Sequence, residues 1–487
     1  MSNILKYSFV AIAAMGISCY SLLAAQTDAQ EVNATASTDS NNTVNYVAPK
    51  LDFLVADENK TRESNKTKEQ DKKFVFENNA TLKMCVTSAI KSNYRVKQAK
   101  ERVLQAEHST REAYADFLPQ GSVTATGTRK GTKGFDIQEY EEAKGDVTLT
   151  YNIFSSGMHA ATVARTKITK REQEQKLRGT IEEEIGKLVD AYFSVVYGRL
   201  AIEANRNNFE KLQQILEIVK IKREFGAATA GDESSILASV SNAKTALINT
   251  ESAYNNARDY YEFLTGTKID MLNPYETDFD VKLQSFDELF EDIRYKNIDL
   301  SIIKTQIAGK QKDVFINKAT DWPKLDLSIS NSRRFRKDFN YNKWSATPSQ
   351  GNNRDSLAEL TLTYNFYTGG RTEAKTAKLL SEVSGLVYNL EYTMQDTKWN
   401  SQKLFNSVQT NTRTLETLTT EINASRRMAD AYWEKFRLSS QDLVTLLQAQ
   451  RQVNTAELEK LRSEKTRIVD YFNLLAKQGK LLEFFGF

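Results

Sequence analysis

Two long tracts of the chain carry the periodic apolar pattern of packed helices. Apolar residues recur every seven positions at Leu188, Val195, Ile202, Phe209 and Leu216, and a second such line runs through Ile236, Ala243, Thr250, Ala257 and Leu264. This spacing is typical of coiled-coil packing. Proline, which is excluded from helix interiors, is absent from 120–273 and 349–487. The pattern predicts very long helices, one of them from Met158 to about Phe225 and on the order of 100 Å long.

Four shorter segments alternate apolar and polar residues, as strands do. The segment at about 147–154 places on one face Val147, Leu149, Tyr151 and Ile153. The segment at about 358–367 likewise places on one face Leu360, Leu362, Tyr364 and Phe366. Partner strands are expected at about 121–128 and 324–331, each just after a proline. The alternation suits a membrane β-barrel, and we assign the eight residues to its lipid-facing side. A soluble hairpin would show the same pattern.

The chain is internally duplicated. Leu149-Thr150-Tyr151-Asn152 recurs 213 residues later as Leu362-Thr363-Tyr364-Asn365, whereas Asn93 recurs 204 residues later as Asn297. The difference between these two offsets places an insertion between the paired strands of the second copy, around Pro348. Each copy comprises a helix, a hairpin and two long helices joined by a turn. We place the first repeat at 78–282, the second at 283–482, and a C-terminal tail at 483–487.

The N-terminus has the features of an export signal. Lys6 precedes an apolar stretch that ends in small residues, so we predict a signal peptide at 1–25. A transmembrane anchor is the alternative, although Phe9 to Ala25 is short for a span and contains serines. Residues 26–77 are polar and charged, and we expect a disordered extension there.

Composition narrows the chemistry. The 66 basic and 63 acidic residues nearly balance, so nothing points to a nucleic-acid partner. The sequence contains two histidines and two cysteines, and Cys19 would leave with the signal peptide. It shows no paired carboxylates, phosphate loop or Cys/His metal cluster. We therefore predict no enzyme activity, no cofactor and no metal site.

Four strands are too few to close a barrel. Unpaired N–H and C=O groups are costly in lipid. Oligomerisation into a closed, preferably even-stranded barrel is the simplest remedy, and several copy numbers satisfy it. On the helices alone, a coiled-coil rod of the cytoskeletal kind is an alternative.

Several short motifs, in a duplicated order, carry a resemblance to a known family. They are Phe117-Leu118-Pro119, Asn152 to Gly157, Phe225-Gly226 with Asp232, Asn365 to Gly370 with Arg371, and Phe436 with Leu446-Leu447-Gln448-Ala449. From about Asn78 to Leu482 the chain resembles the TolC-type outer-membrane efflux and secretion channels. The resemblance implies an α+β membrane protein: a long antiparallel α-helical coiled-coil barrel joined to a transmembrane β-barrel, with four strands per chain and twelve in a homotrimer.

The same resemblance implies where the channel would be gated. In this family, the turns between the long helices form the closed periplasmic entrance and dock an adaptor protein. The corresponding candidates here are Gly226, Asp232, Ser439, Gln441, Asp442, Thr445 and Gln448. Ser439 replaces the usual glycine, and Thr445 and Gln448 stand where some members carry cation-binding aspartates. This implies a pore without that acidic constriction, and leaves Asp232 and Asp442 as the nearest acidic candidates for a gate. These two aspartates could equally serve only to cap the helices that follow them.

We expect a passive exit duct in the outer membrane that extends into the periplasm. Its partners would be a periplasmic adaptor, an inner-membrane ABC transporter or proton-driven pump, and an exported protein or small molecule. Type I protein secretion is favoured, because the Gly226-Ala227-Ala228 turn and the layout look closest to that branch. The outer-membrane component of a multidrug efflux pump is the alternative, and a periplasmic coiled-coil scaffold is a second alternative.

Overall fold

The computed structural model describes residues 82–130, 140–266, 283, 285–338, 353–438 and 442–487. All of these belong to one compact unit, Phe74–Phe487. The expected signal peptide (1–25), the expected extension (26–77) and the insertion around Pro348 lie outside the described residues. Within the described ranges, none of the helices combines the length and apolar character that a membrane crossing requires.

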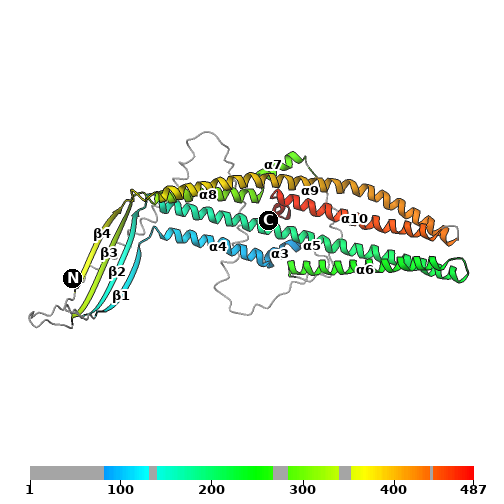
Figure 1. Cartoon of the computed structure of the whole chain (residues 1–487), viewed down its shortest axis with the longest axis horizontal. Coiled ribbons are helices and arrows are strands. Elements are labelled where there is room, and N and C mark those ends of the chain that lie inside the picture. The colour runs from blue at the N-terminus through cyan, green and yellow to red at the C-terminus, as the bar shows by residue number, and fades with distance from the viewer. Residues whose placement is uncertain (1–81, 131–139, 267–282, 284, 339–352, 439–441) are drawn as a thin grey trace, which may run out of the picture. The chain divides into compact units, whose positions relative to one another are not determined.

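The described elements form two matching series (Figure 1). The first comprises α3 (Leu82–Ser92), α4 (Tyr94–Ala115), β1 (Gln120–Lys130), β2 (Tyr140–Phe154), α5 (Met158–Glu224) and α6 (Ala230–Thr265). The second comprises α7 (Phe286–Lys296), α8 (Ile298–Ala319), β3 (Lys324–Asp338), β4 (Asn353–Thr363), α9 (Arg371–Arg437) and α10 (Leu443–Lys477), and α11 (Leu481–Phe485) follows. Both α5 and α9 contain 67 residues. The predicted duplication and long helices are confirmed.

Residues matched between the copies have matching structural roles. Asn93 and Asn297 are the N-caps of α4 and α8, and their side chains accept hydrogen bonds from backbone N–H groups of the first turn. Gly157 and Gly370 precede α5 and α9 with φ of 78° and 75°. Because side chains other than glycine's are strained there, the repeated glycines set where each long helix begins.

Helix α5 is the centre of the packing. It contacts α3, α4, α6, α8 and α10, whereas α9 packs along α8 and α10. The first seven-residue line is covered as predicted: Leu188, Val195 and Leu216 are buried, and Ile202 and Phe209 are half-buried. The helices are therefore held side by side by apolar stripes rather than by one globular core.

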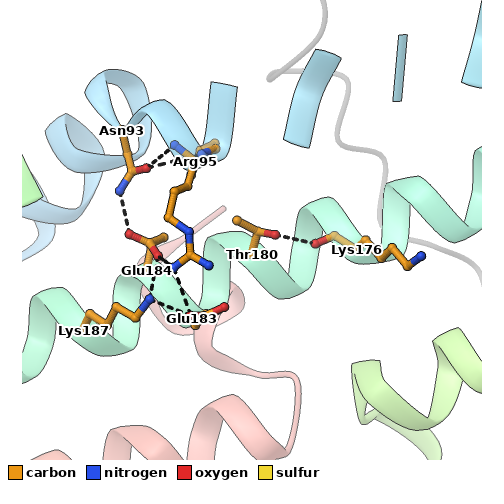
Figure 2. A network of polar contacts seen from close by, with 8 residues as sticks. Asn93, Arg95, Lys176, Thr180, Glu183, Glu184 and Lys187 are labelled. Atoms are coloured by element: carbon orange, nitrogen blue, oxygen red, sulfur yellow. Dashed lines mark hydrogen bonds and ion pairs between the residues drawn. The ribbon is translucent and has the colours of Figure 1, made fainter. Parts of the chain in front are cut away.

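A carboxylate network fixes the start of α4 on α5 (Figure 2). The Asn93 amide donates to Glu184 over 2.7 Å, and Arg95 and Lys187 approach the same carboxylate at 2.6 and 2.9 Å. Arg95 and Lys187 also bind the neighbouring Glu183. The Glu184 side chain is only 7% exposed, and its three donors offset the cost of burying the charge.

The four strands form one antiparallel sheet in the order β1-β2-β3-β4. The β1–β2 and β3–β4 pairs are hairpins within a repeat, and the β2–β3 pair joins the two repeats. Strands β2 and β3 contain 15 residues each and extend beyond the predicted ranges. Strands β1 and β4 lie at the two edges of the sheet.

The last strand ends earlier than predicted. We expected it at about 358–367, but β4 ends at Thr363, so Tyr364 and Phe366 lie beyond it. The reason is pairing: Thr363 is opposite Lys324, the first residue of β3, and the following residues have no strand beside them. In the first copy the equivalent Tyr151 remains in β2 because it pairs with β3.

The two faces of the sheet differ in exposure. In the outer halves of β2 and β3, the odd-numbered residues 141–147 and 329–335 are exposed, whereas the even-numbered residues between them are half-buried. Side chains are crowded on one face and not on the other, which indicates that the sheet curves. The even-numbered side chains of β2 and β3 lie on its concave face. The concave face carries the ion pairs Lys144–Asp146 and Arg334–Glu142, at 2.9 and 3.6 Å. The convex face carries instead the exposed apolar side chain of Val147.

A second buried carboxylate, Glu182, lies two residues before Glu184 on α5. The Arg178 guanidinium contacts Glu182 at 3.2 Å and donates to the Gly479 carbonyl at 2.6 Å. Burial raises the pKa of Glu182 to about 7, with smaller raising effects from Asp299 and Glu483, and the attraction of Arg178 only partly opposes it.

We predict that Glu182 makes folding less favourable as the pH rises. Its pKa in the folded chain lies above the ordinary 4.5, so the folded state holds the proton more tightly. This contribution is complete below about pH 4.5 and is lost as the pH rises through about 7, a change on the order of 3 kcal/mol per chain. The midpoint temperature of thermal unfolding should therefore fall less between pH 5 and pH 8 in Glu182→Gln than in the wild type.

The neighbouring Glu183 provides the control. Hydrogen bonding to Lys187 lowers its pKa, so Glu183 is ionised throughout this interval in both states and Glu183→Gln should leave the decline unchanged. An equal decline in the wild type and in Glu182→Gln would contradict the assignment.

Candidate channel entrance

The turn between α5 and α6 is a glycine-terminated helix end. The N–H of Ala227 donates to the carbonyl of Lys222 over 2.7 Å, and the N–H of Gly226 donates to that of Arg223 over 2.9 Å. This pair of bonds is the Schellman arrangement, which needs a left-handed residue. Gly226 supplies it with φ of 76°.

Helix α6 begins with a reciprocal cap that involves Asp232. The N–H of Asp232 donates to the Thr229 hydroxyl oxygen over 3.1 Å, and the Thr229 N–H donates to the Asp232 carboxylate over 2.8 Å. The Thr229 N–H and hydroxyl together lower the pKa of Asp232. The capping interpretation is therefore observed here, and a gate role for the same carboxylate stays a prediction.

At the second turn, Asp442 is the N-cap of α10 and accepts from the N–H of Val444 over 3.1 Å. Thr445 is half-buried, and Gln448 is exposed beside a shallow groove that Glu421 and Arg451 also line. The candidates Ser439 and Gln441 lie outside the described residues. In the part of the chain that the structure describes, no group of three or more His, Cys, Asp or Glu side chains is arranged to hold a metal ion.

The structure brings the two turns together through one apolar cluster, which we call the tip cluster. Its buried members are Leu212, Ile215, Leu216, Val219, Ile236, Ala243, Phe436, Leu443, Leu446 and Leu447. They come from α5, α6, α9 and α10, so the ends of both helical hairpins form one packed unit. Tyr432 and Trp433 cover it partly.

A lysine links the two hairpins beside the tip cluster. The Lys222 ammonium, near the end of α5, donates to the carbonyl of Phe436 and lies 4.1 Å from the centroid of its ring. That carbonyl belongs to the last turn of α9, where carbonyls lack partners within the helix and the helix dipole attracts a cation. Partial burial lowers the pKa of Lys222. No local sequence pattern predicts this contact, because its partners are 214 residues apart.

Two large apolar side chains project at equivalent places. Phe225 and Leu438, 213 residues apart, are the C-cap residues of α5 and α9 and are 82% and 79% exposed. The tip thus presents Phe225 from the first repeat and Leu438 from the second as largely uncovered apolar side chains.

We predict that Lys222→Met loosens the tip while preserving its apolar volume. The variant removes the ammonium donor from the Phe436 carbonyl and leaves only the Leu438 N–H directed at it, at a cost of about 1 kcal/mol. Hydrogen exchange should become faster in the first turns of α10 and the last turn of α9. The control Lys220→Met removes an exposed lysine that forms an ion pair with Glu217 on its own helix, and it should exchange like the wild type. Unchanged exchange in Lys222→Met would refute the link.

Comparison with known proteins agrees with this geometry. The model of the family described as outer membrane efflux protein matches residues 85–267 and 289–477, one segment in each repeat. The pyoverdine export outer membrane protein OpmQ of Pseudomonas aeruginosa is 22% identical over 370 residues, which cover 73% of this chain and 76% of OpmQ.

Solved structures show the same fold. CusC has a TM-score of 0.71 at 13% identity, covering 83% of this chain and 93% of the CusC chain. The CmeC outer membrane channel of Campylobacter jejuni has a TM-score of 0.69 at 15% identity, covering 82% and 86%. The family match spans most of both repeats, so the chain belongs to the outer membrane efflux protein family, whose members are non-enzymatic transport channels of the outer membrane.

Proposed function

We propose that three copies of this chain form one channel that serves as the exit duct of a tripartite export system. The observation that carries the proposal is the open sheet: β1 and β4 each have a neighbour on one side only. In lipid such edges leave backbone groups unpaired. Pairing β4 of one copy with β1 of the next removes every edge, and three copies supply the twelve strands expected from the family.

The duplication suggests the register of that junction. Within the chain, β2 of one repeat pairs with β3 of the other, with Leu149 opposite Ile329 and Tyr151 opposite Leu327. Applying the offsets of 213 and 204 residues to these pairs places Leu362 opposite Ala125, and Tyr364 opposite Val123, of the neighbouring copy. Tyr364 and Phe366 would then extend β4 in the assembly.

This register predicts an intermolecular disulfide. Residues directly opposite each other on antiparallel strands lie within bonding range of paired cysteines, so Leu362→Cys with Ala125→Cys should oxidise between copies. Denaturing gels of oxidised membranes should show a ladder that ends at three chains.

The control moves one cysteine by a single residue. In Leu362→Cys with Thr126→Cys, the second side chain points to the opposite face, so the yield should be low. Absence of cross-linking in the first pair, or equal cross-linking in both, would contradict the register.

The two faces of the sheet suit lipid and water. We assign the convex face to lipid, because it carries the predicted residues Val147, Leu149 and Tyr151 of β2 and Leu360 and Leu362 of β4. Tyr364 and Phe366 would continue it in the extended β4. We assign Ile153, which lies at an irregularity in the β2–β3 register, to the same side. The concave face, with its Lys144–Asp146 and Arg334–Glu142 ion pairs, would line the water-filled interior.

The long helices would continue this channel into the periplasm and end at the tip. There Gly226, Asp232, Ser439, Gln441, Asp442, Thr445 and Gln448 are the proposed entrance residues. The exposed Phe225 and Leu438 would dock a periplasmic adaptor, because exposed aromatic and apolar side chains commonly anchor protein interfaces. An inner-membrane pump would supply the energy.

Export of a small molecule is the better supported cargo class, because the relative OpmQ is named for pyoverdine export. Type I protein secretion is the second candidate, favoured by the Gly226-Ala227-Ala228 turn. The two differ in what a deletion strain loses. We expect the strain to accumulate fluorescent small-molecule pump substrates while it still releases its secreted proteins into the medium. The wild-type gene should restore efflux. Loss of one protein from the medium with normal dye efflux would reverse the assignment.

A further inference from the structure

The convex face of the sheet changes character along β3. Leu325, Leu327 and Ile329 come first, followed on the same face by Asn331 and then Arg333. Asn331 donates to the hydroxyl of Ser356 on β4 over 2.7 Å, which confirms that these two residues share a face. The order along the face is therefore an apolar band, a hydrogen-bonding row and a basic row.

The basic row contains two arginines that oppose each other. Arg333 of β3 is directly opposite Arg354 of β4, and both are exposed. Neither makes an ion pair with any described residue. By contrast, the adjacent Arg334 on the concave face is paired with Glu142, and Arg129 of β1 is paired with Glu141 at 3.7 Å.

Like charges placed directly across a strand pair repel each other. An anion between the two guanidinium groups would convert that repulsion into attraction, and guanidinium groups bind phosphate through paired hydrogen bonds. Arg333 is held over the ring of Phe335, 4.9 Å from its centroid. The ring fixes the guanidinium group on the outer surface and adds an apolar contact beside it.

The position of the pair along the strand selects the kind of anion. Eight residues separate Leu325 from Arg333, or about 27 Å along the strand and about 20 Å across the membrane at a typical barrel tilt. The apolar band of such barrels is about 25 Å tall. With Leu325 at the periplasmic edge of that band, Arg333 and Arg354 would lie about 5 Å from its outer edge, on the side away from the helices. Their long side chains would reach the lipid headgroups there.

We propose that Arg333 and Arg354 bind the phosphate groups of a phosphorylated glycolipid in the outer leaflet. This inference rests on the proposed function, since it needs the sheet to span the membrane with the helices in the periplasm. The lipid would neutralise the arginine pair while its acyl chains cover the apolar band on the same face.

Binding of lipid A to the full-length protein in detergent tests the proposal. Diphosphorylated lipid A should bind the wild type at least about tenfold more tightly than the same lipid without phosphates. Inorganic phosphate at the same concentration should not displace it. Absence of the phosphate preference would overturn the proposal, as would full displacement by inorganic phosphate, which would indicate a free-anion site. Neither comparison requires a variant.

Two variants locate the site. Arg333→Gln with Arg354→Gln should abolish the preference, whereas the control Arg334→Gln, one residue away on the opposite face, should keep it. Equal loss in both, or retention in the double variant, would place the site elsewhere and overturn the assignment.

Conductance in planar bilayers separates this inference from the function on which it rests. The wild type and the double variant should conduct equally. Conducting channels that show no phosphate preference would overturn the lipid site alone, and a wild-type protein that forms no channel would overturn both.

Discussion

Hydrogen bonding along the edges of a four-stranded sheet is the constraint on which the rest of the molecule depends. Strands β2 and β3 satisfy their backbone groups on both sides, whereas β1 and β4 have one neighbour each. Water can satisfy such edges, but lipid cannot. In the proposed channel, further copies of the chain pair with these edges and complete the cylinder.

The duplication makes that completion simple. The same asparagine caps, the same left-handed glycines and one 67-residue helix occur in each repeat, so the contact between repeats would serve as a template for the proposed contact between copies. The repeats differ where their neighbours differ. Asn93 binds Glu184 of α5, whereas the equivalent Asn297 donates to the carbonyl of Lys477 at the end of α10.

Periodicity predicted the helices well because their packing is local and repetitive. The helix expected from Met158 to about Phe225 runs from Met158 to Glu224, and no member of its seven-residue line is exposed. The strands were harder to delimit. Alternation of apolar and polar residues fades in β3 where Arg333, Arg334 and Arg336 begin, although pairing continues to Asp338. The end of β4 was wrong because strand length depends on a partner that begins elsewhere in the sequence. The Lys222–Phe436 link and the opposed arginines were likewise invisible, since both depend on register between distant segments.

The central claim is that one chain cannot complete the cylinder and that three do. Light scattering of the detergent-purified protein, corrected for bound detergent, measures the protein mass of the particle directly. The account predicts three chains of 55.3 kDa before any processing. A stable, folded particle that contains a single chain would contradict it.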